Sequence, residues 1–541
     1  MNRPLFWILA LAFGLRLCGI GFGLPHLFHQ DEPIIVNHAM AYGGGDFNPH
    51  FFKIPPLTSY LLFFLYGLYY GLTAVTQGVS PEGFAVLFFC DPSVFYLIAR
   101  IVFGAILGTA SVYLLFRLTK KKVSENAACW AALLFSVSFL HVRDSHYVYA
   151  DIPMIFSMLM ALSVERAALS GFWVGTAVAF KYIAAPILFP VLFIRRRRRE
   201  VLAVLGSAAA AYAVLNPFGI LDFHFFIKEI LQQAKAESPV PFFHHLSYSL
   251  GEGHGFGAVI VGLLGAIILW RNRPALRWLF IFPVIYYLMT VFFSQPYERY
   301  AMPLVPFLCL TGGYTISLIF EKSFGRTALR TAAWFLAALS LGPTLVKSVY
   351  LDALICRPDT RAQARAWIHH NVPPGEKIVL DHPFFSPPLT QSDDQILSKA
   401  SKVQALPFHK EMKLKKLRWL LEAHQGEKKF RVYYLNEGGV ADTSFLASSP
   451  ALPPDPEVLE REGVRYYIRY RHPGESRFFE ERMKSQAVLV NQFSPYHDGA
   501  KVHTEDPWAN VALPFLSREL YSRRAPGPYL EIYELKHGLE G

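Results

Sequence analysis

The sequence predicts a polytopic α-helical membrane protein that carries a small α/β domain at its C-terminal end. Hydrophobic residues make up 53% of the 541 residues and charged residues only 17%, where a soluble chain carries about 25% charged residues. Stretches of about 20 apolar residues, the length that crosses a bilayer, recur in the first two thirds of the chain. Five Cys residues cannot form a disulfide framework in a chain of this length. The composition therefore excludes a disordered chain and a disulfide scaffold, and it argues against an ordinary soluble enzyme.

The charge of the chain fits a membrane protein as well. The 52 Lys and Arg residues against 41 Asp and Glu residues give a net charge of +11. Such a balance would suggest nucleic acid as a partner if the basic residues formed one face of a soluble domain. Many of them instead form short runs beside apolar stretches, which is how membrane proteins fix their orientation. We therefore expect membrane lipid, and no nucleic acid, among the partners.

Nine stretches are predicted to span the membrane. They are residues 5–23, 93–118, 127–141, 150–169, 201–215, 256–270, 278–293, 301–320 and 331–350. The first is not a cleavable signal, because no small-x-small site follows it and Arg16 lies inside it. Two further stretches are ambiguous. Residues 57–78 are long enough to span, and residues 171–194 form either one span or a short helical hairpin that turns near Lys181.

The positive-inside rule decides between these arrangements. The basic clusters that should lie in the cytoplasm are residues 120–122, 195–199, 271–277 and 322–330. All four do so if residues 57–78 lie along the outer interface and residues 171–194 form a hairpin, whereas the other arrangement puts residues 120–122 outside. We therefore predict about eleven transmembrane helices. In this topology the loops that carry the acidic and basic candidates below share the extracytoplasmic side and can meet in one place.

The tail after residue 350 alternates β-type runs with helical stretches, which predicts a small α/β domain. The β-type runs are residues 377–381, 430–435, 464–470, 487–491 and 529–535. The helical stretches include residues 361–370, 411–424 and 456–462. The tail contains no GxGxxG, P-loop, HExxH or paired CxxC motif. We therefore divide the chain into a transmembrane domain over 1–350 and an extracytoplasmic docking or substrate-positioning domain over 351–541.

Acidic residues at the predicted membrane surface are the first candidates for chemistry. Asp31 and Glu32 follow the first span, where one of them can act as a general base if apolar surroundings raise its pKa. Adjacent carboxylates are also ordinary in a solvated loop. Asp151 lies at the lip of a span, where a carboxylate faces a polar cavity, binds a metal or pairs with a cation. A structural pair with Arg143 or Lys181 is the competing explanation.

Basic residues in three other loops are suited to an anion. Lys53 precedes two prolines that also suit the start of a helix. Lys181, followed by Tyr182 at the predicted hairpin tip, can bind a phosphate or simply extend to the membrane surface. Arg299, followed by Tyr300, has a planar fork that matches a phosphate or carboxylate, and an interfacial aromatic belt explains that segment equally well.

A family resemblance rests on the order of these motifs. It is carried by Asp31-Glu32, Pro55-Pro56-Leu57, RIVFGAILG over residues 100–108, Asp151-Ile152-Pro153, Lys181-Tyr182, Asn216-Pro217-Phe218 and Arg299-Tyr300 with Pro303 and Pro306. With them the sequence resembles the membrane glycosyltransferases of the GT-C fold, in particular the protein O-mannosyltransferase and lipid A aminoarabinose transferase family, glycosyltransferase family 39. The resemblance covers roughly residues 5–350. The tail is similar only in being an extracytoplasmic appendage.

The resemblance implies transfer of a sugar from a polyprenyl-phosphate carrier to an acceptor hydroxyl, with inversion. Asp31, beside Glu32, matches the catalytic carboxylate of the first loop. Asp151 matches the acidic residue of the next extracytoplasmic loop, which some relatives use near a metal. The residues expected at the lipid phosphate are Lys53, Lys181, Tyr182, Arg299 and Tyr300. No nucleotide-binding motif is needed for this chemistry.

One departure from the family concerns metal. Aminoarabinose transferases have a Glu-Lys pair directly before the two prolines, and here the pair is Lys53-Ile54. A carboxylate that their metal site uses is therefore missing. We assign no cofactor and leave a divalent cation held by Asp31 and Asp151 as an open alternative.

Two other functions stay open at this stage. A transporter or lipid flippase for a glycolipid also carries ionisable residues in broken membrane helices, although its acidic residues would not gather at one face. A membrane polymerase or ligase would take a lipid-diphosphate glycan as donor. The sequence identifies neither the sugar nor the acceptor, which is a protein, a lipid or a glycan. On family grounds we expect a bacterial inner membrane.

Overall fold

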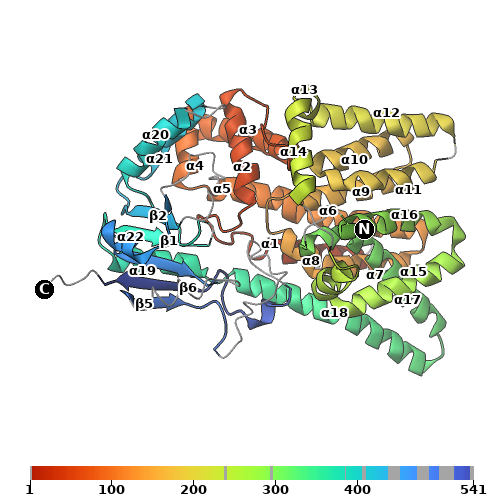
Figure 1. The fold of residues 1–541 in the computed structure, drawn as a ribbon. Coiled ribbons are helices and arrows are strands. Elements are labelled where there is room, and N and C mark those ends of the chain that lie inside the picture. Colours follow the sequence, from red (N-terminus) through yellow and green to blue (C-terminus); the bar gives the residue numbers. More distant parts are fainter. Residues whose placement is uncertain are drawn as a thin grey trace. The chain divides into compact units, whose positions relative to one another are not determined.

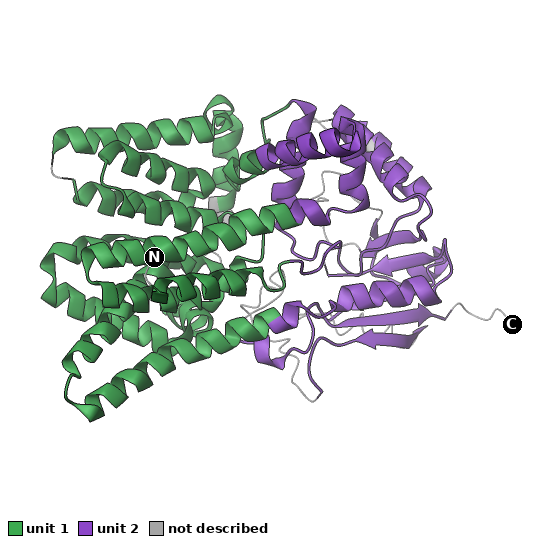
Figure 2. Cartoon of the chain, turned by 180° about the vertical axis from the view of Figure 1, so that it is seen from behind, with its two compact units in different colours: residues 1–20, 46–62, 97–352 green, residues 21–45, 63–96, 353–541 purple. Residues whose placement is uncertain are grey.

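The computed structural model describes residues 3–195, 197–236, 240–292, 296–383, 385–404, 410–435, 451–471, 486–498 and 517–536. The chain forms two compact units, which Figure 2 shows in different colours. Unit 1 comprises Met1–Ile20, Asp46–Leu62 and Leu97–Asp352, and unit 2 comprises Gly21–Gly45, Phe63–Tyr96 and Ala353–Gly541. The tail therefore groups with two segments that come early in the sequence.

Unit 1 is built from helices that pack side by side (Figure 1). They are α1 (Arg3–Leu17), the π-helix η2 (Arg100–Ile106), α6 (Leu107–Lys122), α7 (Glu125–Ser136), α8 (Phe139–Asp144), α9 (Asp151–Ser163), α10 (Ala167–Phe180), η3 (Tyr182–Ile187), α11 (Leu188–Phe193), α12 (Arg198–Leu215), α13 (Phe218–Leu221), α14 (Phe223–Ala236), the π-helix η4 (His245–Gly255), α15 (Phe256–Asn272), η5 (Pro274–Phe280), α16 (Ile281–Phe292), η6 (Glu298–Leu304), α17 (Val305–Lys322) and most of α18 (Thr327–Ile355). Two groups pack most extensively, α10 with α9 and α12, and α17 with α7 and α15.

Six helical stretches among the described residues are long and apolar enough to cross a membrane. They are Leu57–Gln77, Ser93–Lys122, His245–Asn272, Pro274–Phe292, Glu298–Lys322 and Thr327–Asn371. Four shorter apolar helices accompany them, Pro81–Cys90, Asp151–Ser163, Ala167–Phe180 and Tyr182–Phe193. The stretch 57–78 is thus one continuous helix that could also span, so the total of eleven spans stays a prediction.

The predicted bounds of three spans are wrong. The first, predicted over 5–23, is a helix only as far as Leu17. Residues 127–141 form two helices, α7 and α8, and the backbone groups freed at the break bond to Thr344, whose hydroxyl accepts from the Phe139 N–H and donates to the Val137 carbonyl. The span predicted over 150–169 ends at Ser163. Glu165 follows in the gap before α10, since a helix inside lipid ends before such a charge.

The chain breaks at Lys181, where the sequence predicts a turn. Lys181 is extended, with φ −157° and ψ 125°, between the end of α10 and the start of η3. Both η3 and α11 pack against α10. The predicted break is confirmed, and it places a lysine between two apolar helices.

Unit 2 contains a mixed six-stranded sheet in the order β3-β2-β1-β4-β6-β5. The strands are β1 (Lys377–Leu380), β2 (Arg431–Leu435), β3 (Ala451–Leu452), β4 (Tyr466–Tyr470), β5 (Ala487–Phe493) and β6 (Leu530–Leu535). The first four in the spatial order pair in parallel, and β6 pairs antiparallel with both β4 and β5. All five predicted β-type runs are strands within two residues of the expected bounds.

The helices of unit 2 lie before and between these strands. They are α2 (Glu32–Ala41), η1 (Tyr42–Gly44), most of α3 (Leu57–Gln77), α4 (Pro81–Cys90), the first part of α5 (Ser93–Ala99), α19 (Thr360–Asn371), α20 (Asp393–Gln404), α21 (Lys410–Ala423), α22 (Pro456–Arg461) and η7 (Leu520–Ser522). Helix α19 covers the sheet, with Ala364 and Ile368 buried against Ile378 and Val432. The sequence predicted α19, α21 and α22 but missed α20.

Candidate functional site

Lys181 forms a buried ion pair with Asp151 in unit 1. Its Nζ donates to both carboxylate oxygens, at 2.8 Å to Oδ1 and 2.9 Å to Oδ2. The Lys181 side chain is 14% exposed and that of Asp151 only 3%. Asp151 is the first residue of α9, where the helix dipole favours a carboxylate. The sequence left open a polar cavity, a metal ion or a cation as the partner of Asp151. In the structure Asp151 pairs with Lys181.

Aromatic rings surround this lysine and a second cation. The Nζ of Lys181 lies 5.1 Å from the ring centres of both Tyr149 and Tyr300. The guanidinium of Arg299 lies 4.5 Å from the ring of Tyr149 and 5.6 Å from that of Tyr297. Lys181 and Arg299 therefore share the Tyr149 ring, which brings two cations together at one aromatic side chain.

Opposing effects act on the pKa of Lys181. Burial lowers its pKa, as does the positive charge of Arg299, while Asp151 raises it. The two cations thus repel each other in surroundings that water screens poorly. An anion placed between them would relieve both the burial cost and the repulsion.

The segment that carries Arg299 is fastened by an ion pair that the sequence did not predict. Arg143 donates from Nη1 to Glu298 and from Nε to Asp144, the latter at 2.9 Å. Arg143 and Glu298 are each only 1% exposed. Charge-assisted hydrogen bonds of this kind fix geometry strongly. They hold η6 against α8, so Arg143 braces Arg299 instead of pairing with Asp151.

The loop that carries Lys53 is held by the amphipathic helix α14. The backbone N–H of Phe52 donates to Glu229, and the Phe52 ring packs on Phe226 at 5.7 Å between ring centres. The ring of Tyr182 lies 5.8 Å from the same Phe226. Lys53 itself is exposed. Helix α14 therefore links the Lys53 loop to the residue that follows Lys181, and only its amphipathic pattern could have indicated this role.

Asp31 and Glu32 belong to unit 2, at the start of α2. Asp31 is the N-cap residue of the helix, and its own backbone N–H donates to Nδ1 of His29 at 3.2 Å. Glu32 is fully buried, and Asp31 is half-buried. The loop before them is fixed by Arg361, which stacks on Phe28 at 4.0 Å and donates to its carbonyl. The expected meeting of Asp31 with Asp151 joins residues of different units and stays a prediction.

The described residues offer little for a metal ion. No three His, Cys, Asp or Glu side chains in these ranges lie close enough together to hold one. Asp151, one of the two acids that the sequence left open as ligands, instead accepts two hydrogen bonds from an ammonium group. The surroundings of Asp151 fit the Lys181 ammonium group better than a metal ion, so no step of the reaction is assigned to a metal.

Comparisons with known proteins agree with the fold. Residues 83–295 match the model of glycosyltransferase family 87. ArnT from Cupriavidus metallidurans in the apo state is similar over 97% of both chains, with a TM-score of 0.52 and 12% identity. The same enzyme bound to undecaprenyl phosphate gives a TM-score of 0.47 at 13% identity over 97% of both chains. An oligosaccharyltransferase of Archaeoglobus fulgidus, tethered to an acceptor peptide, gives 0.45 at 13% identity over 98% of this chain and 88% of the other.

No curated protein matches the sequence at a significant level. At 12% identity the similarity to apo ArnT shows the fold alone. The chain is therefore an integral membrane protein with the GT-C fold of membrane glycosyltransferases, and the predicted resemblance to that fold is confirmed. The matching family model is that of family 87, so the assignment to family 39 stays a prediction.

Proposed function

We propose that the chain is a glycosyltransferase that moves a sugar from a polyprenyl-phosphate carrier to an acceptor hydroxyl, with inversion. The observation that carries this proposal is the cluster in unit 1 where Lys181 and Arg299 share the ring of Tyr149. The family 87 match supports it, because residues 83–295 include Asp151 and Lys181.

The leaving group explains why two cations are needed. When the bond between the anomeric carbon and the phosphate oxygen breaks, the departing lipid phosphate gains negative charge. Lys181 and Arg299, held in place before the reaction, stabilise that charge in a poorly hydrated site. The Arg299 fork suits two phosphate oxygens, while Lys181 acts as a point charge. We group Lys53, Tyr182 and Tyr300 with them at the phosphate.

The acceptor proton needs a base. We assign this role to Asp31, with Glu32 beside it, so that the acceptor oxygen attacks the anomeric carbon while its proton passes to the carboxylate. Asp151 has a different part. Because both its oxygens accept from Lys181, it positions the ammonium group that faces the phosphate.

The membrane setting follows from the donor. A long polyprenyl chain stays in lipid while its headgroup reaches the loops. We place the reaction on the extracytoplasmic side of a bacterial inner membrane, with the tail on the same side as the acceptor. The acceptor is a protein, a lipid or a glycan.

Transfer by purified protein tests the proposal. Polyprenyl-phosphate mannose, polyprenyl-phosphate glucose and a polyprenyl-diphosphate sugar are each incubated with the protein and a membrane extract as acceptor, and released lipid phosphate is measured by mass spectrometry. We expect release from a monophosphate donor, and its loss by about 100-fold or more in Asp31→Asn, the scale of general-base catalysis. Asp91→Asn, an exposed aspartate in the same unit, should keep full activity.

Three outcomes contradict the proposal. Full activity of a folded Asp31→Asn variant would show that Asp31 is not the base. Release of the lipid product only from the diphosphate donor would show that the donor is a lipid diphosphate and not a lipid monophosphate. Movement of the intact glycolipid across liposomes without bond cleavage replaces transfer with transport.

A further inference from the structure

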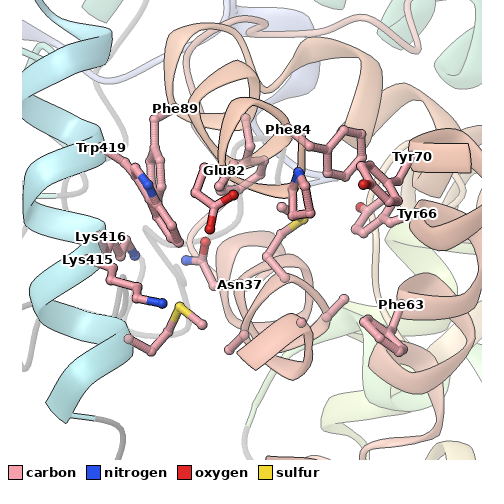
Figure 3. Close-up of a pocket in the computed structure, with 18 of the residues that line it drawn as sticks. Asn37, Phe63, Tyr66, Tyr70, Glu82, Phe84, Phe89, Lys415, Lys416 and Trp419 are labelled. Carbon is pink, nitrogen blue, oxygen red and sulfur yellow. The ribbon is translucent and has the colours of Figure 1, made fainter. Parts of the chain in front are cut away.

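A cavity of about 390 Å³ lies inside unit 2, and none of the residues assigned to transfer above lines it (Figure 3). Helices α2, η1, α3, α4 and α21 form its walls. Its lining residues include Phe63, Tyr66, Tyr70, Phe84, Phe88 and Trp419. Aromatic and other apolar side chains together make up most of the wall, which suits an apolar ligand of substantial size.

One wall of the cavity belongs to a helix that suits a membrane. Helix α3 is long and apolar enough to span. Phe64, Leu68 and Leu72 are 64%, 58% and 61% exposed on one face, since they are four residues apart. Tyr66 and Tyr70 lie on the cavity side. The cavity is thus next to a lipid-facing helix, where an acyl chain can enter it.

The rim on helix α21 is basic. Lys413, Lys415 and Lys416 line the cavity beside Trp419, against the single carboxylate of Glu82. Figure 3 shows Lys415 and Lys416 on the same helix as Trp419. The Trp419 ring stacks on Phe89 at 6.2 Å between centres, and the ammonium of Lys416 lies 5.5 Å from the Phe89 ring. Among the described residues that line the cavity, three lysines and one glutamate therefore lie where the aromatic wall ends.

Burial also affects one of these lysines. It lowers the pKa of Lys413. A phosphate at the rim would offset that cost, because an opposite charge nearby favours the ammonium form. Lysines at the edge of an apolar, aromatic cavity suit an anionic amphiphile, with its charged group at the lysines and its apolar part in the cavity.

We propose that this cavity binds an anionic glycerophospholipid of the surrounding membrane, with an acyl chain between α3 and α4 and the phosphate at the α21 lysines. The site binds the lipid and does not react with it. It ties the tail helix α21 to the membrane helices of unit 2 and uses none of the side chains assigned to transfer.

Two glycines of α3 provide a matched pair of variants. Gly67 lines the cavity, and a Cβ on it would meet no atom within 4 Å. Gly71 lies one turn later, has the same open space and does not line the cavity. The Cβ of Gly67→Phe is therefore accommodated at a position that lines the cavity, whereas Gly71→Phe makes the same change in helix composition elsewhere.

Native mass spectrometry of the full chain in detergent, titrated with dioleoyl-phosphatidylglycerol, measures the binding. We expect Gly67→Phe to weaken binding about tenfold or more, and the double variant Lys415→Gln/Lys416→Gln to weaken it similarly, as for lost charge-assisted bonds. Gly71→Phe should bind as the parent does, and dioleoyl-phosphatidylcholine should bind more weakly than phosphatidylglycerol.

Competing ligands give the outcomes that overturn the inference. Unchanged phosphatidylglycerol binding in Gly67→Phe means that the lipid binds elsewhere. If Gly67→Phe instead abolishes binding of undecaprenyl phosphate alone, the cavity belongs to the donor. If inorganic phosphate displaces the lipid completely at equal concentration, the acyl chain contributes nothing. The readout is binding, so a failed transfer assay leaves this test intact.

Discussion

Asp151 and Lys181 depend on each other because both side chains are buried. Removing one partner leaves the other as an uncompensated charge, which costs more than the pair itself contributes. Substitutions of these two residues are therefore expected to affect stability and activity differently. The pair stabilises unit 1 in any case, whereas the proposed transfer needs the lysine itself.

A double-mutant cycle separates these roles. Asp151→Leu and Lys181→Met should each destabilise the protein by about 3–5 kcal/mol, and the double variant should be closer to the parent, because it leaves no buried charge. Thermal unfolding in detergent measures this recovery. Transfer should be lost in Lys181→Met and stay lost in the double variant. An active double variant would show that Lys181 does not serve the leaving phosphate.

At this scale the sequence showed which residues are unusual but not how they pair. Lys181, Asp151 and Arg299 were found because charged residues are rare next to membrane segments. The pair of Arg143 with Glu298 joins positions 155 apart, and the Phe52 contact with Glu229 joins positions 177 apart. No local pattern predicts contacts over such distances. They depend on how the helices pack.

The RIVFGAILG motif over residues 100–108 fixes the positions of neighbouring elements. Arg100 donates to the carbonyl of Ile20 at 2.9 Å, which fixes the segment after α1. Gly104, in the π-helix η2, packs so closely that a Cβ there would overlap the carbonyl oxygen of Ser145. Ser145 lies in the loop that leads to Asp151. The glycine therefore lets η2 approach the backbone that sets the position of the site.

Replacing that glycine tests the contact. Gly104→Ala should destabilise unit 1 by about 1–3 kcal/mol or more through overpacking, and it should lower transfer because the loop before Asp151 shifts. Gly206→Ala is the control, since Gly206 in α12 has no atom near its added Cβ. It should be neutral or stabilising by about 0.5–1 kcal/mol, the usual gain of Ala over Gly in a helix. Equal unfolding temperatures of the two variants would contradict the close approach.

Elements with strong local patterns were predictable, and those without were not. The β-rich runs of the tail, such as Tyr466–Tyr470, are strands where expected. Helix α20 was missed because Asp393–Gln404 is mostly polar and has few apolar positions to mark a period. Span ends at Ser163 and Val137 shifted because nearby charges and side-chain bonds to the backbone, rather than hydropathy, end those helices.

At the scale of the whole molecule, the sequence divides the chain near residue 350, while the contacts group the tail with Gly21–Gly45 and Phe63–Tyr96. Composition changes at the end of the membrane segments, so it marks that boundary well. Composition does not indicate which early segments pack with the tail. Asp31 belongs to one of these segments, which ties the proposed base to the tail through Arg361 and Phe28.

The predicted orientation has a direct test in the native cysteines. Cys356 is exposed just after α18 and Cys309 is buried in α17. With the other cysteines changed to Ser, a membrane-impermeant maleimide should label Cys356 on intact bacterial spheroplasts, because positive-inside clusters put the tail outside. Lys121→Cys in a cysteine-free chain should react only after permeabilisation, and Cys309 should react in neither state. Labelling of Cys356 only after permeabilisation would put the tail in the cytoplasm and remove the extracytoplasmic reaction.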